Sequence, residues 1–313
     1  MPNHLWMQDD HHAYADTVRR FLDEEFQPHR NAWKEAGTIP KSFWRKAGDL
    51  GILGATTPED HGGLGLSRHF DAVTYIEQAK AGDSGWGFAV HNIAAHYIIA
   101  YGTDEQKARW LPKLVTGEQV AAIAMTEPGT GSDLQAVKTT AEKDGNSYRI
   151  NGSKTFITSG MRADIYTVAV RTGEPGMNGI SLLLIDRDTP GFDRTPLKKM
   201  GWWASDTATL YFDNCKVPAE NLLGVENQGF QAIMLNFNYE RLWLAAGCIS
   251  AARTCFNEVV GYAKERMVFG KPLTEKQVIR HKLVQMAQAV NASQAYLDQV
   301  AWRIEQGEQP VAD

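Results

Sequence analysis

The spacing of apolar residues changes twice along the 313-residue chain. From about residue 8 to residue 118, apolar side chains recur every three to four positions, which predicts helices. Near residue 120, short runs bounded by Gly, Asn and Asp take over and predict strands. After Pro218 the helical spacing returns, over residues 229–266 and 274–307. This order predicts three domains, at 1–120, 121–225 and 226–313.

Charge and cysteine content limit the classes of function. The net charge is −5, with acidic and basic residues interspersed, so no basic stripe for nucleic acid is present and a small-molecule partner is expected. Three cysteines are too few and too irregularly spaced for a disulfide framework, and no Cys/His cluster has metal-ligand spacing. No apolar run approaches the ~20 residues that span a bilayer, and the first residues do not read as a signal peptide. We therefore expect a cytoplasmic protein with no metal and no membrane span.

Two neighbouring patterns in the strand region suit a flavin ring. Residues 124–133 read Ala-Met-Thr-Glu-Pro-Gly-Thr-Gly-Ser-Asp, a turn that can present several backbone N–H groups to electron-rich atoms. A tight turn with no ligand would explain this stretch by itself, because Pro and Gly favour turns anyway. Residues 155–158 then bring an aromatic residue, Phe156, which could supply a flat apolar wall. The two patterns together favour a flavin site over a plain turn.

Other local patterns predict connections and helix ends. Asn151-Gly152 lies between two strand-like runs and predicts a hairpin with a type I′ turn. The glycine-rich stretch 57–66 lacks the signatures of phosphate-binding loops, so we interpret it as a structural connection. A short helix is predicted to start at Asp104 and to be limited by Pro112. Thr274 and Gln277 meet the capping-box rule at the start of the last helix.

Glu240 lies in a predicted helix that is apolar on nearly every face. A carboxylate in such surroundings carries a desolvation cost that sequences usually avoid unless the group is paired or used. From the residues alone, an ion pair with Arg241 or a solvated helix edge is the simpler interpretation. A catalytic base is the alternative.

The order of the regions and their motifs together resemble the acyl-CoA dehydrogenase family of flavoenzymes. The motifs that carry the resemblance are Met125-Thr-Glu-Pro-Gly-Thr-Gly-Ser-Asp133, Asn151-Gly-Ser-Lys154, Phe156-Ile-Thr158, Ser205-Asp206, Lys216-Val-Pro218, Tyr262-Ala-Lys-Glu-Arg266 and Phe269-Gly-Lys271. The resemblance implies an α+β multidomain fold with an N-terminal helical domain, a middle antiparallel β-barrel or sandwich, and a C-terminal helical bundle. It also implies FAD as cofactor and conversion of an acyl-CoA thioester to trans-2-enoyl-CoA. Electrons would pass to an electron-transfer flavoprotein, and the enzyme would be a homotetramer or dimer.

The resemblance also assigns roles to individual residues. Glu240 would be the base that removes the α-proton, at the position used by the isovaleryl-CoA and long-chain branches. The substrate would contact Ser132, Asn238, Tyr239 and Arg241. The flavin would contact Ile123, Met125, Thr126, Gly131, Ser132, Phe156, Ile157 and Thr158. Arg266, Phe269 and Gln277 would hold the FAD of a neighbouring subunit, although Arg266 also suits a helix C-terminus and Gln277 also suits the capping box.

The chain departs from the family pattern at its end, where further helices of the family would follow Asp313. We therefore expect a C-terminally truncated chain with an incomplete bundle. An acyl-CoA oxidase, a related flavin enzyme on the same fold and a non-catalytic fragment remain alternative interpretations. The acyl length is not readable from the residues around Trp86. The nearby histidines are interpreted as satisfied polar groups of a helical domain.

Overall fold

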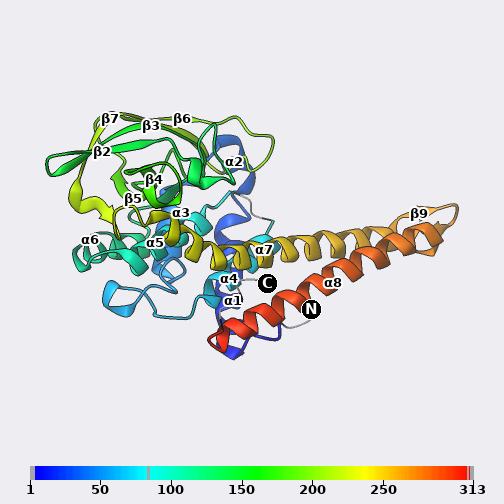
Figure 1. The fold of residues 1–313 in the computed structure, drawn as a ribbon. Coiled ribbons are helices and arrows are strands. Elements are labelled where there is room, and N and C mark those ends of the chain that lie inside the picture. The colour runs from blue at the N-terminus through cyan, green and yellow to red at the C-terminus, as the bar shows by residue number, and fades with distance from the viewer. Residues whose placement is uncertain (1–3, 83–84, 309, 311–313) are drawn as a thin grey trace. The chain divides into compact units, whose positions relative to one another are not determined.

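The computed structural model describes residues 4–82, 85–308 and 310 (Figure 1). The chain divides into two compact units that do not follow its linear order. The first unit contains the described parts of 1–27, 68–83 and 238–313, and the second contains those of 28–67 and 84–237.

In the first unit the N-terminal helix packs against a later helix. Helix α1 (Asp9–Phe21) runs on through a π-helical turn, η1 (Leu22–Phe26), and buries Val18, Phe21 and Leu22. It packs against α4 (His69–Lys80), where the Tyr14 and Thr74 hydroxyls lie 2.9 Å apart. α1 and α4 confirm the helices predicted in this part of the first region.

The two long C-terminal helices of the chain, α7 (Gly229–Glu265) and α8 (Gln277–Glu305), are joined by a short hairpin of β9 (Met267–Val268) and β10 (Lys271–Pro272). Beyond residue 238, α7 lies beside α8 (Figure 1), and Arg253 Nη1 donates to Asn291 Oδ1 at 2.7 Å. The predicted capping box is wrong. Residues Leu273–Glu275 form a 3-10 turn, η6, so α8 begins only at Gln277 and has no side-chain cap.

In the second unit, several helices precede the sheet along the chain. Their bounds are α2 (Arg30–Ala36), α3 (Lys41–Asp49), η2 (Glu59–His61), α5 (Phe88–Tyr101) and α6 (Asp104–Val115). Thr103 caps α6, because its Oγ1 accepts from Gln106 N at 3.2 Å. Pro112 does not limit this helix as predicted, since α6 continues for one more turn. The glycine-rich stretch is a tight connection, in which a Cβ on Gly63 would lie 2.0 Å from Thr57 O.

The sheet of the second unit has eight strands in the order β6-β7-β3-β2-β4-β5-β8, with β1 added parallel to β4 (Figure 1). Most of the other pairs are antiparallel, so the sheet is mixed rather than purely antiparallel. Tyr148, Ile150, Val168, Leu183 and Leu210 belong to its buried core. The strand and short-turn bounds are β1 (Ala121–Ala124), η3 (Leu134–Ala136), β2 (Thr140–Asp144), β3 (Ser147–Ile157), β4 (Ile165–Arg171), η4 (Met177–Gly179), β5 (Ile180–Asp186), β6 (Phe192–Pro196), β7 (Ala208–Pro218), η5 (Ala219–Asn221) and β8 (Leu222–Leu223).

The predicted hairpin at Asn151-Gly152 is wrong, because β3 runs straight through these residues. The pairing with β7 shifts register between Ile150 and Gly152, which marks a bulge. Gly152 has φ 145°, and a Cβ on it would lie 2.6 Å from Thr139 Oγ1. The true hairpin joins β2 to β3 at Gly145, where φ is 62°. Asn-Gly therefore serves here as a bulge that admits a close neighbour.

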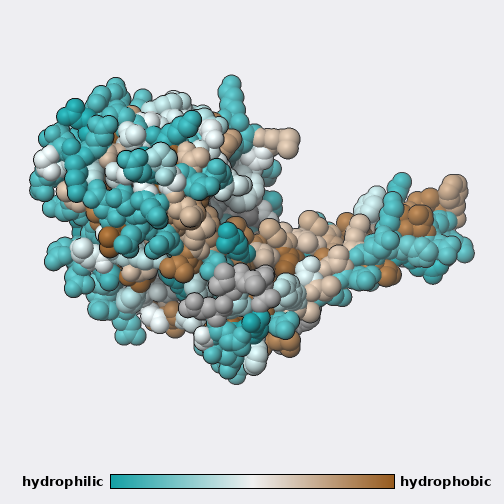
Figure 2. Space-filling model, viewed as in Figure 1, coloured by the Kyte–Doolittle hydropathy of each residue, from teal (hydrophilic) through white to brown (hydrophobic). Residues whose placement is uncertain are grey.

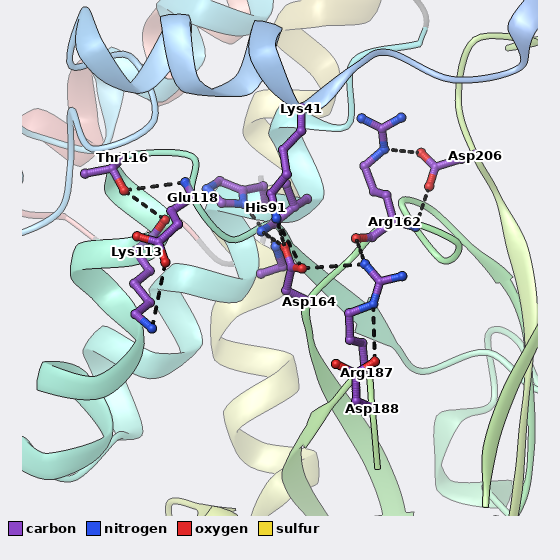
Figure 3. A network of polar contacts seen from close by, with 12 residues as sticks. Lys41, His91, Lys113, Thr116, Glu118, Arg162, Asp164, Arg187, Asp188 and Asp206 are labelled. Atoms are coloured by element: carbon purple, nitrogen blue, oxygen red, sulfur yellow. Dashed lines mark hydrogen bonds and ion pairs between the residues drawn. The ribbon is translucent and has the colours of Figure 1, made fainter. Parts of the chain in front are cut away.

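A polar network fixes the start of β1 in the second unit (Figure 3). Asp164 accepts from Val120 N at 2.8 Å and from Lys41 Nζ at 3.0 Å. His91 accepts from Ala121 N at 3.1 Å and faces Leu114 O with its other nitrogen at 3.1 Å. This pairing places the imidazole proton on Nε2 and confirms the interpretation of His91 as a satisfied structural residue. The strand that leads into the proposed flavin turn is thus held from two sides.

Candidate active site

The turn that follows β1 is a small closed loop. Glu127 and Thr130 exchange two backbone hydrogen bonds, of 2.9 and 3.1 Å, around a Pro128-Gly129 tip. Thr130 Oγ1 donates to Ala136 O at 3.1 Å and ties the loop to the next segment. Within the described ranges, the exposed amides of Gly131 and Ser132 bond to no other residue. The turn therefore leaves backbone donors unpaired at exposed residues, as a site for electron-rich ligand atoms requires.

The structure brings this turn together with the second flavin motif at the end of β3. Thr155 N donates to Thr126 O at 2.9 Å. The buried ammonium of Lys154 donates to Met125 O at 3.0 Å and to Glu127 Oε1 at 2.9 Å. These contacts join residues 27 and 29 positions apart in the sequence, so the two segments lie together.

Phe156 has an unusual conformation at the centre of this surface. Its φ is +60° and its side chain is 70% exposed, at a second register shift of β3 between Lys154 and Ile157. A left-handed conformation costs a non-glycine residue about 1–3 kcal/mol, and an exposed ring recovers little of that cost by burial. Ile157 beside it is buried and Thr158 is half-buried. An exposed aromatic face held next to backbone donors fits the flat ring of a flavin.

A glycine pair around Trp86 supports this surface from behind, a role that the sequence did not indicate. A Cβ on Gly87 would lie 2.5 Å from Ser159 Oγ and 3.4 Å from Thr158 Cγ2. A Cβ on Gly85 would lie 2.5 Å from the Cβ of Ala204. The available signal was the Gly-Trp-Gly pattern itself, since glycines that flank a buried tryptophan indicate close backbone approach.

The first unit contains the predicted base and all the predicted substrate contacts except Ser132, which belongs to the turn of the second unit. Glu240 is half-buried on α7, and Arg241 beside it is exposed. The guanidinium carbon of Arg68 lies 4.4 Å from the ring centroid of Tyr239, and the rings of Tyr75 and Trp243 lie 6.3 Å apart. Burial, followed by the charges of Asp71 and Glu240, raises the pKa of Tyr75. The Glu240 carboxylate is therefore close to an aromatic, poorly hydrated part of this unit.

The hairpin tip between α7 and α8 carries the remaining predicted cofactor residues. Phe269 and Gly270 have φ of 54° and 72°, the two positive values of a type I′ turn. The Phe269 side chain is 93% exposed, and Arg266 and Gln277 are exposed nearby. Leu273 N donates to Arg266 O at 2.9 Å, which holds the base of the tip. A strained aromatic displayed at a tip is unfavourable unless it meets a partner or ligand.

Known proteins match this chain over nearly its whole length. Models of the acyl-CoA dehydrogenase N-terminal, middle and C-terminal domains match residues 8–118, 122–215 and 227–313. The chain belongs to the acyl-CoA dehydrogenase family. Its members are FAD-dependent oxidoreductases, and the expected three-part fold is confirmed.

Individual relatives show the same likeness. The mitochondrial long-chain specific acyl-CoA dehydrogenase of Mus musculus is 40% identical over 92% of this chain and 68% of its own length. The crystal structure of an acyl-CoA dehydrogenase from Geobacillus kaustophilus is 44% identical, with a TM-score of 0.95 over 98% of this chain and 82% of that one. A glutaryl-CoA dehydrogenase from Mycobacterium smegmatis, solved in complex with FADH2, is 31% identical, with a TM-score of 0.88 over 97% of this chain and 78% of that one.

The described residues contain neither a membrane-spanning helix nor a metal-binding cluster. In those ranges no helix is long and apolar enough to cross a bilayer. The same residues contain no cluster of His, Cys, Asp and Glu suited to a metal ion. The domain boundaries and the roles of single residues stay predictions.

Proposed function

We propose that this chain catalyses FAD-dependent α,β-dehydrogenation of an acyl-CoA thioester to trans-2-enoyl-CoA, with an electron-transfer flavoprotein as electron acceptor. The observation that carries the proposal is the exposed, strained Phe156 ring beside a turn whose Gly131 and Ser132 amides bond to no other described residue. Such a surface is costly for the free protein and suits a planar cofactor with electron-rich nitrogen and oxygen atoms at its edge.

The residues that would hold the flavin ring belong to both joined segments. Phe156 would pack against the ring, and Thr158 would contact its N5 atom. Ile123, Met125 and Thr126 would form the wall next to the turn, with Gly131, Ser132 and Ile157 around it. Bound FAD would supply an acceptor for the hydride that leaves the β-carbon of the substrate.

Glu240 would take the α-proton onto its carboxylate. The α-proton of a thioester is weakly acidic, so a base of this kind works best where water is excluded and its basicity is raised. The half-buried position of Glu240 near Tyr75 supports this role. Asn238, Tyr239 and Arg241 would bind the acyl-CoA, with Arg241 toward the charged CoA portion.

The oligomer is part of the proposal. Arg266, Phe269 and Gln277 would contact the FAD of a neighbouring subunit, which makes a homotetramer or dimer necessary for tight cofactor binding. The exposed Phe269 at a hairpin tip supports this arrangement. A cytoplasmic location stays a prediction.

The test is the visible spectrum of the purified protein after incubation with FAD, before and after anaerobic addition of a series of acyl-CoA esters. We expect flavin bands that one class of ester bleaches, which would also identify the preferred acyl chain. Bleaching followed by rapid peroxide formation in air would replace the dehydrogenase with an oxidase. A protein that binds FAD but is bleached by none of the esters would contradict the proposal.

A further inference from the structure

Lys154 carries a completely buried ammonium group directly behind the proposed flavin turn. Its side chain is 0% exposed, and Nζ donates to Met125 O at 3.0 Å and to Glu127 Oε1 at 2.9 Å. Glu127 in turn accepts from the amides of Lys138 at 2.8 Å and Thr139 at 2.9 Å. The pair therefore connects the turn, the end of β3 and the segment that enters β2.

Stability alone does not explain this buried ion pair, because burying its two charges costs free energy. Removing two charges from water costs several kcal/mol per ion, and well-packed apolar residues often replace a buried pair without loss of stability. What the ion pair adds is defined geometry, because each hydrogen bond has a preferred length and direction. Apart from this pair, the Thr155–Thr126 backbone bond joins the turn to β3.

The contact with Met125 O also has an electrical consequence for the neighbouring amide. In a planar trans peptide the C=O of Met125 and the N–H of Thr126 point in opposite directions. A cation that binds the carbonyl polarises the whole peptide group and strengthens the N–H on its far side as a donor. The Lys154 charge would therefore strengthen the Thr126 N–H as a donor without itself contacting a ligand.

We propose that Lys154 and Glu127 are positioning residues, which fix the turn against Phe156 and polarise the Met125–Thr126 peptide toward the flavin. This inference rests on the proposed flavin site. Neither side chain touches the cofactor, so both act through the backbone and through the bulge that presents Phe156. The two sequence motifs that contain Glu127 and Lys154 would then act together to position the turn.

The charge states of the two groups support this role. Burial lowers the pKa of Lys154 to about 8, although the carboxylate of Glu127 opposes this shift. Burial alone would raise the pKa of Glu127, but Lys154 and the hydrogen bonds from Thr139 outweigh it and lower that pKa. On β7 the residue paired with Lys154 is Leu210, so Glu127 is the titratable group that faces the ammonium. The pair is therefore charged at neutral pH and loses its cation as the pH rises through 8.

The experiment compares Lys154→Met, which keeps length and removes charge, with Arg162→Met. Arg162 forms a 2.8 Å ion pair with Asp206 in the same unit, so its loss controls for the general effect of breaking a pair. Amide hydrogen exchange without FAD would be followed over residues 125–132 and 155–158. The FAD dissociation constant would be measured by flavin fluorescence, together with the positions of the visible bands.

We expect Lys154→Met to speed exchange in both segments, shift the visible bands and weaken FAD binding about tenfold or more. Arg162→Met should leave FAD affinity nearly unchanged even where it lowers the melting temperature. In the unmodified protein FAD affinity should fall as the pH rises through 8, and Lys154→Met should abolish that dependence. If Lys154→Met does not fold, Glu127→Gln should produce the same changes in exchange and FAD affinity.

The outcomes separate this inference from the proposed function. Normal FAD binding, bands and exchange in Lys154→Met would overturn the positioning role and leave the flavin site intact. Failure of the unmodified protein to bind FAD would overturn the flavin site, while the exchange data would still decide whether the pair fixes the turn.

Discussion

At the scale of single residues, backbone strain at an exposed aromatic residue marks a position that does not contribute to the stability of the folded chain. Phe156, Trp202 and Phe269 are exposed aromatics with positive φ, where glycine would be easier. Two of them lie at positions that the family resemblance assigns to FAD. Stability and function should therefore respond in opposite directions to glycine at such a position.

Phe156→Gly tests this separation. Relief of about 1–3 kcal/mol of backbone strain should offset the entropy cost of glycine and leave the melting temperature equal or higher. FAD affinity should fall, because the aromatic wall is lost. Trp202→Gly is the matched control, since it removes an exposed positive-φ aromatic of the same unit with no assigned cofactor role. Unchanged FAD binding in Phe156→Gly would exclude the wall.

Glu127 predicts a defined pH dependence of stability. Because its pKa is lowered from 4.5 on folding, its contribution is complete above that value and is lost as the pH falls below it. Glu127→Gln should cost about 3 kcal/mol of unfolding free energy near pH 7, as loss of one partner of a buried pair does. The two proteins should converge in stability as the pH drops below 4.5. Urea unfolding at several pH values measures this, and a constant difference down to acid pH would contradict it.

Glu240→Gln tests the assigned base. The variant should keep FAD and acyl-CoA binding, while the rate of flavin bleaching falls by about 10²–10⁴-fold, the usual contribution of a general base. Glu258→Gln, at an exposed position of the same helix, should bleach at the normal rate. Stopped-flow absorbance under anaerobic conditions makes the measurement. Bleaching at a near-normal rate in Glu240→Gln would move the base elsewhere.

At the scale of elements, a substitution of glycine by alanine is expected to destabilise the protein more at the Gly152 bulge than at the Gly145 hairpin. Gly152→Ala brings a Cβ to 2.6 Å from Thr139 Oγ1 and 2.8 Å from Thr139 Cα. We expect a loss of about 1–3 kcal/mol, as overpacking causes. In Gly145→Ala the new Cβ meets nothing within 4 Å, so the φ of 62° is the only source of destabilisation. Thermal unfolding of the two variants measures the difference. Equal losses of stability would show that the backbone φ, and not the close contact with Thr139, determines the cost.

The sequence predicted the helices and the order of the regions because apolar spacing is a local property. It wrongly predicted a hairpin at Asn151-Gly152. A glycine with positive φ occurs in both hairpin turns and bulges, and only the pairing of β3 with β7, which the sequence does not show, tells them apart. It missed Gly87 and the Lys154–Glu127 pair for a similar reason, because both depend on contacts between distant segments. The start of α8 shifted because a 3-10 turn took up the residues of the expected cap.

At the scale of the whole molecule, exposed apolar side chains gather on the hairpin of α7 and α8. Figure 2 shows hydrophobic atoms along this part of the chain. Apart from Phe269 at the tip, the exposed residues include Leu244, Val259, Tyr262, Met267, Val278, Val284, Met286 and Tyr296. An exposed apolar surface of this kind indicates an association site, in accordance with the proposed oligomer.

If the hairpin tip completes a neighbour's FAD site, cofactor affinity must depend on protein concentration. We expect FAD to bind more weakly on dilution, in parallel with dissociation seen by analytical ultracentrifugation. Phe269→Ser should leave the oligomer intact and weaken FAD binding at every concentration, because it removes the contact without touching the helices. Met177→Ser changes an exposed apolar residue of the second unit and should alter neither property. A monomer whose FAD affinity is independent of concentration would show that each chain binds its cofactor by itself, and the strain at Phe269 would then need another cause.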